Sequence, residues 1–75
     1  MLRNHVLFNQ KVMLEFKKNI LVKVSFDLEL FEKELRKAIK WLRMDELVQL
    51  KSWCLDTFKG AYRAVAAERF DEVGL

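Results

Sequence analysis

The chain has 75 residues with a formal net charge of +3, and 52% of them are hydrophobic. This length suits a single domain over 1–75 and excludes two domains, and the one cysteine excludes a disulfide within the chain. One cysteine and one histidine also fall short of the four ligands of a typical structural zinc site, so we expect neither a metal nor a cofactor.

The first third of the chain, residues 5–26, is predicted to form strands. Apolar and polar residues alternate there with the period typical of half-buried strands; the apolar rows are Val12, Leu14 and Phe16, then Ile20, Val22, Val24 and Phe26. A three-residue loop pairs Phe16 with Ile20 and gathers both rows on one face, with Asn19 in the left-handed position of the loop. The prediction is a β-hairpin, or a three-stranded meander. The further strand of the meander lies at Val6 and Phe8.

The period changes after Phe26, and residues 28–43 are predicted to form a helix. Apolar residues recur there at steps of three and four, namely Leu28, Phe31, Leu35, Ala38, Ile39 and Leu42. They cover an arc of roughly 100° around the helix, which is enough for one packing face. Ser25 or Asp27 is the expected cap at the start of this helix.

A second helix is predicted over 45–69, capped by Asp45. Its apolar arc is about 220° wide, roughly twice what one packing face uses, so we expect this helix to be buried on two sides. The second side predicts a subunit interface of a homodimer, formed by Leu50, Trp53, Leu55 and Tyr62. The alternative is a helix that ends at Gly60, followed by a short third helix that folds back.

These elements together predict an α+β fold. An N-terminal β-hairpin or three-stranded meander packs on two antiparallel α-helices, and the second helix carries the dimer contact. A partner subunit also agrees with the size of the chain, because a core this small supplies only about 3–5 kcal/mol. With no signal sequence, no apolar run long enough to cross a membrane and one unpaired cysteine, the expected location is the cytoplasm, away from the membrane.

Positive charge is concentrated near the N-terminus. Residues 1–24 contain five lysines and arginines and one glutamate, which leaves an excess of four positive charges. Such a basic ribbon can contact nucleic acid or an acidic protein. The alternative is that lysines at a sheet edge only discourage aggregation between strands.

Few residues indicate catalysis. Cys54 lies within the apolar arc of the second predicted helix, so we expect a packed thiol and not a nucleophile, and the chain has no glycine-rich phosphate loop. Trp41 falls outside the apolar arc of the first helix and follows Lys37 by one turn. It is a candidate anchor for a partner, or a side chain stacked beneath Lys37, or one covered by the sheet or another subunit. The sequence therefore predicts a non-enzymatic protein.

The order of a strand at 20–26 followed by two helices resembles the ribbon-helix-helix DNA-binding repressors over about residues 20 to 58. In that family, paired strands insert into the major groove and their outward side chains contact bases. The resemblance implies base contacts by Leu21, Lys23 and Ser25, and the basic hairpin adds Lys17 and Lys18. Asp45 and Glu46 place two carboxylates where that family holds a phosphate, so DNA binding is the alternative function.

The preferred hypothesis is a small protein–protein interaction or regulatory module that self-associates. A second protein partner is compatible with it, and nucleic acid ranks below protein as a partner. The sequence names no pathway for this module.

Overall fold

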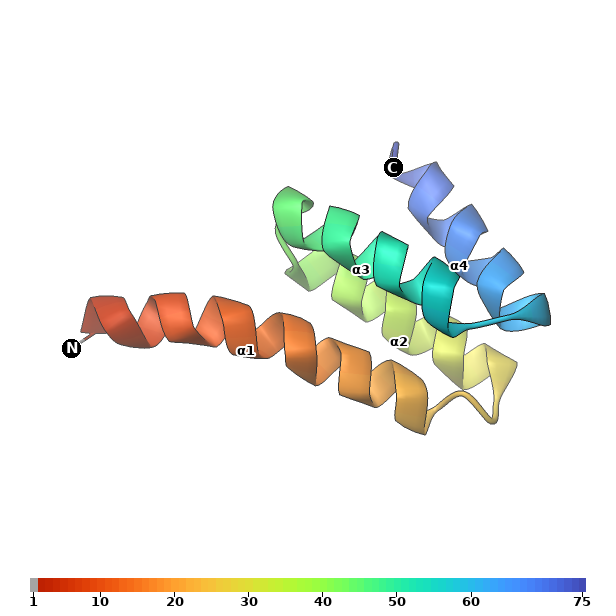
Figure 1. Cartoon of the computed structure of the whole chain (residues 1–75), viewed down its shortest axis with the longest axis horizontal. Coiled ribbons are helices and arrows are strands. Elements are labelled where there is room, and N and C mark those ends of the chain that lie inside the picture. Colours follow the sequence, from red (N-terminus) through yellow and green to blue (C-terminus); the bar gives the residue numbers. More distant parts are fainter. Residues whose placement is uncertain (1) are drawn as a thin grey trace.

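The computed structural model describes the backbone of residues 2–75 and the side chains of residues 12–75. Residues 2–75 form four helices and no strand (Figure 1). The helices are α1 (Leu2–Lys23), α2 (Leu28–Trp41), α3 (Met44–Thr57) and α4 (Gly60–Glu72). The predicted α+β fold is therefore wrong, and the chain is all-α.

Helix α1 occupies the segment that was predicted to form the hairpin or meander. Leu14 and Leu21, which are two helical turns apart, are 6% and 1% exposed, so they share one buried face. Val12 and Phe16 belong to the same alternating row as Leu14, yet both are exposed. Asn19 does not have the left-handed conformation of the predicted loop, because only glycines have positive φ among the described residues. The period-2 pattern misled the prediction, because an alternation of apolar residues over so few positions does not exclude a helix. In the helix that forms, Leu14 and Leu21 lie seven residues apart and share the buried face.

Helix α2 agrees with the prediction, because Asp27 caps its start as expected. The Asp27 carboxylate accepts a hydrogen bond from the backbone N–H of Leu30 at 3.2 Å. The buried residues of α2 are Phe31, Leu35 and Ala38, all from the predicted apolar arc. The helix ends at Trp41, two residues before the predicted end.

Helix α3 begins after a tight corner, and its start differs from the prediction. Arg43 is the N-cap residue, and its backbone N–H donates to the carboxylate of Glu46 at 3.1 Å. Asp45 lies in the first turn, where its negative charge suits the helix dipole, and is not the cap.

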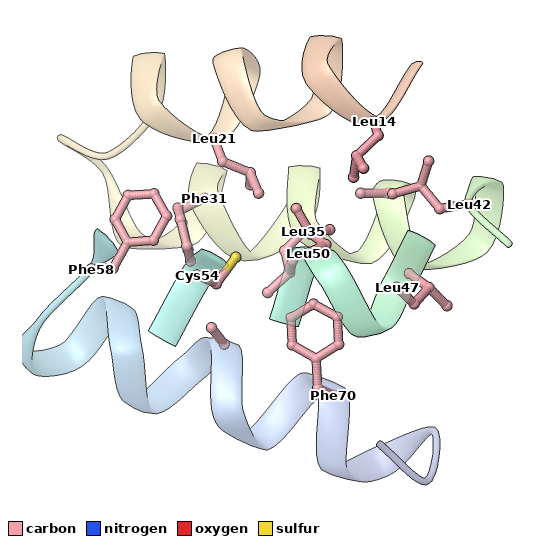
Figure 2. Close-up of a cluster of buried hydrophobic side chains, with 12 residues drawn as sticks. Leu14, Leu21, Phe31, Leu35, Leu42, Leu47, Leu50, Cys54, Phe58 and Phe70 are labelled. Atoms are coloured by element: carbon pink, nitrogen blue, oxygen red, sulfur yellow. The ribbon is translucent and has the colours of Figure 1, made fainter. Parts of the chain in front are cut away.

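The predicted continuous helix over 45–69 is wrong, and the alternative break at Gly60 occurs. Gly60 has a φ of +61°, a left-handed conformation that glycine adopts without steric cost. The chain reverses there, so α4 packs against both α2 and α3, while α1 contacts the same two helices. In Figure 2, α1 and α4 lie on opposite sides of α2 and α3.

The core lies between these three layers and draws on all four helices (Figure 2). Its largest fully buried side chains are Phe31, Phe70, Leu21, Leu35, Leu50 and Cys54. The Phe31 ring meets the edges of Phe58 at 4.9 Å and Tyr62 at 5.2 Å between ring centroids. These edge-to-face contacts join α2 to the α3–α4 turn and to α4.

Candidate interaction surface

Three large apolar side chains remain exposed around the α2–α3 corner. Trp41 is 73% exposed, Met44 is 60% exposed and Val48 is 53% exposed. Trp41 is the last residue of α2, while Met44 and Val48 lie one turn apart at the start of α3. We call these three residues the corner surface.

Helix geometry explains why the corner surface is excluded from the core. Trp41 lies about a quarter turn around α2 from the buried line of Phe31 and Leu35. On α3, Met44 and Val48 share a face that points away from the buried Leu50. The sequence pattern indicated Trp41 as an anchor but missed Met44 and Val48, although their four-residue spacing was a usable signal.

A basic segment adjoins the corner surface. Between residues 36 and 43 the chain has four cationic side chains and no carboxylate; they are Arg36, Lys37, Lys40 and Arg43. Three of them have a carboxylate on a nearby residue: Arg36–Glu32 at 3.6 Å, Lys37–Glu34 at 3.4 Å and Arg43–Asp45 at 3.6 Å. Lys40 is in no ion pair with the side chains that the structure describes. The corner is therefore apolar with a positively charged border.

Two open depressions lie along the exposed side of α2, and Arg36 and Lys40 line both. The first, of about 350 Å³, is lined by charged residues of α2 alone. The second, of about 310 Å³, lies between α2 and α4 and adds Ile39 and Val73 to its lining. Both are open surface features of mixed charge, because Glu29 and Glu32 also line the first and Glu72 also lines the second.

Arg69 at the second depression has a structural role. Its side chain is only 10% exposed and its guanidinium lies 2.9 Å from Glu32 of α2, 3.0 Å from Glu68 and 3.1 Å from Glu72. These carboxylates already neutralise its charge, and its Nε atom is buried without a hydrogen-bond partner. Arg69 therefore ties α4 to α2, and it is not available to a ligand.

The residues predicted to form a subunit interface are used largely within the chain. Leu50 is 0% exposed and has no surface left for a second subunit. Trp53 packs edge-on against Phe58 at 5.4 Å, and Tyr62 meets Phe31. Leu55 is partly buried on α3. The wide apolar arc that suggested two buried sides is explained by the chain reversal at Gly60, while the dimer itself stays a prediction.

Lys37 and Trp41 lie one turn apart on α2, but the Lys37 ammonium is directed to Glu34. The cation–π contact in the structure is instead between Lys18 and the ring of Trp53, at 5.7 Å from the centroid. Trp41 is 73% exposed, so no other part of the described chain covers it; the anchor role and covering by another subunit both stay predictions.

The residues implied by the repressor resemblance do not form a reading strand. Residues 20–23 belong to α1, so the predicted strand at 20–26 is wrong. Leu21 is buried, and the Ser25 hydroxyl donates to the backbone carbonyl of Val22 at 2.6 Å. Lys17 and Lys18 are partly buried, and Lys23 alone of this set is a fully exposed cation.

Cys54 is a packed thiol, as predicted, with no exposed surface. Burial raises the pKa of the Cys54 thiol to about 12, although the nearby positive charge of Lys18 acts in the opposite direction.

Within residues 12–75, no three His, Cys, Asp or Glu side chains gather closely enough to hold a metal ion. Among the described residues, no helix combines the length and apolar character needed to cross a membrane. No protein-family model, curated protein or solved structure matches the chain.

Proposed function

We propose that this protein is a small non-enzymatic interaction module whose corner surface contacts a protein partner. The observation that carries the proposal is the exposure of Trp41, Met44 and Val48, each more than half exposed in a chain whose core closes without them. Tryptophan and methionine are enriched at the centres of protein interfaces, where a few anchors supply most of the binding energy.

The proposal favours a different protein over a second copy of the chain as the partner. The dimer was predicted from the width of the apolar arc in residues 45–69. Packing of α3 and α4 within the chain accounts for that width. The corner surface is separate from the residues of that arc that pack in the core. Self-association is therefore an outcome that the experiments must distinguish.

Quantitative affinity capture from the protein's own cell tests this function. The wild-type chain is compared with Trp41→Ser and Val48→Asp, and Phe26→Ser serves as the matched control, because Phe26 is 77% exposed but lies at the α1–α2 turn. Loss of an interface anchor costs about 2 kcal/mol or more, so a specific partner falls to a few per cent of its wild-type recovery at about constant expression.

The expected result is one protein that is retained by wild type and by Phe26→Ser, and lost with both corner variants. Thermal unfolding of each variant confirms that the fold is retained. Recovery of the same proteins with all four chains, or of no protein other than the chain itself, contradicts the proposed function.

A further inference from the structure

We infer that the corner surface binds an acidic amphipathic helix of the partner protein. This inference rests on the proposed function and specifies the chemistry of the partner. The evidence comes from the charge around the corner, the arrangement of the apolar side chains, and the charge of the α1 segment beside it.

Four cations border the corner, at Arg36, Lys37, Lys40 and Arg43, and one exposed carboxylate, Asp45, lies among them and pairs with Arg43 at 3.6 Å. Lys40 has no ion-pair partner among the described side chains, and Lys37 is paired with Glu34 only across one helical turn at 3.4 Å. Exposed pairs of this kind contribute little net stability, so little is lost when a partner's carboxylate approaches these cations. Arg69 in contrast is held by three carboxylates at 2.9 to 3.1 Å and stays within the fold.

The region combines apolar side chains with cations, which suits a partner that has one apolar face and one acidic face. Along the chain, Trp41 follows the cations of α2 at Arg36, Lys37 and Lys40, and it precedes Met44 and Val48 of α3. An amphipathic helix presents apolar side chains at steps of three and four and polar side chains beside them. Its apolar row fits Met44 and Val48, and carboxylates along its flank fit α2.

A second copy of the chain fits this surface less well. In Figure 1 the first half of α1 projects beyond the other three helices, on the side where α2 meets α3. Residues 2–12 contain Arg3 and Lys11 and no acidic residue, and the first acidic residue of the chain is Glu15. Placing this half of α1 on the positively charged corner of another copy brings like charges together, which opposes binding.

Nucleic acid and anionic membranes also offer negative charge. A nucleic-acid backbone, however, presents phosphates without an apolar row for Met44 and Val48. On α1, Lys17 and Lys18 are partly buried and the Lys18 ammonium lies over the Trp53 ring, so these two lysines are less available to phosphates. These ligands are therefore competing outcomes of the test.

The test uses two synthetic amphipathic peptides of about 18 residues with identical apolar positions, one with glutamates and the other with lysines on its polar flanks. Binding is followed by the fluorescence of Trp41 in a Trp53→Phe background, which leaves one tryptophan, and by anisotropy of a dye on the peptide. We expect a blue shift of Trp41 emission with the glutamate peptide, and binding about tenfold tighter than that of the lysine peptide at about 0.15 M salt.

Charge-reversal variants identify the surface. Lys37→Glu combined with Lys40→Glu should reverse the preference between the two peptides, and Val48→Asp should weaken both by about tenfold or more. Lys23→Glu combined with Lys59→Glu is the control for the same change in net charge, because both residues are exposed and lie outside the corner. Circular dichroism of every variant verifies that the helices remain.

Equal binding of both peptides, or no binding of the glutamate peptide, overturns the inference. It is also overturned if a DNA duplex or phosphatidylserine vesicles bind more tightly than the peptide, or if sedimentation shows that a dimer buries Trp41. A cellular partner lost on corner mutation, together with failure of the glutamate peptide, rejects the acidic helix while the interaction function stands.

Discussion

Cys54 lies among Leu21, Phe31 and Leu50, all of which are fully buried. Burial disfavours the thiolate and raises the pKa of Cys54 to about 12. An exposed cysteine ionises at about 8.5, so the folded chain keeps this proton while the unfolded chain releases it. Since the folded state binds more protons above about pH 9, its stability falls as the pH rises through that range.

The native Cys54 thiol should therefore resist modification. We expect Ellman's reagent at about pH 8 to react with the folded chain at less than about 1% of the rate measured in denaturant. Adding Ser52→Cys supplies an exposed thiol two residues away, which should react at the rate of a free thiol in the same molecule. Rapid modification of both thiols in the folded variant would contradict the packing of Cys54.

Gly60 lies where the chain reverses. The sign of the change in stability when alanine replaces Gly60 tests whether the reversal depends on this glycine. An added Cβ meets no atom within 4 Å, so the cost of Gly60→Ala comes only from the left-handed φ of +61°. We expect Gly60→Ala to lower the free energy of unfolding by about 1–2 kcal/mol, measured by urea denaturation, and Gly60→Asn to cost less. If residues 45–69 formed one continuous helix, alanine would instead raise stability by up to about 1 kcal/mol.

At the scale of the helices, α2 was predictable from sequence and α1 was not. Steps of three and four residues and the cap at Asp27 both pointed to a helix over 28–43, and α2 spans Leu28–Trp41. In α1 the alternation of apolar and polar residues around Leu14 is typical of a strand. The helix is favoured by packing against α2 and α3. Gly60, the first residue of α4, carried the information for the start of this helix, but the unbroken phase of the apolar stripe competed with it.

The Arg69 cluster holds α4 against α2. Replacing Arg69 with methionine removes its contact with Glu32, and we expect a loss of about 1–2 kcal/mol in the free energy of unfolding. Lys37→Met is the matched control, because Lys37 pairs with Glu34 at an exposed position and should change stability by less than about 0.5 kcal/mol. Equal losses in the two variants would show that Arg69 does not tie the helices together.

Over the whole molecule, we expect buried side chains to determine stability and the exposed side chains of the corner surface to determine partner binding. Leu35→Ala removes a fully buried side chain and should cost about 2–5 kcal/mol in chemical denaturation. Trp41→Ser removes a larger side chain that is 73% exposed, and should change the free energy of unfolding by no more than about 0.5 kcal/mol. A large loss of stability with Trp41→Ser would place Trp41 in the core of the fold.

The sequence predicted only part of the corner surface. Trp41 was recognised because it lies off the apolar arc of residues 28–43, whereas Val48 was placed in the apolar arc of a longer predicted helix and Met44 in the corner before that helix. Their exposure depends on where α4 packs, and that is decided by the reversal at Gly60. A pattern read along one helix could not distinguish the face covered by α4 from the face left open.

Photo-crosslinking in the living cell tests the central claim most directly. A photoreactive amino acid replaces Val48 on the corner surface, and the same amino acid replaces Ala64, an exposed residue on α4, in the matched control. The account predicts a crosslink from position 48 to one other protein and none to that protein from position 64. Crosslinks from position 48 only to further copies of this chain, or the same products from both positions, would contradict it.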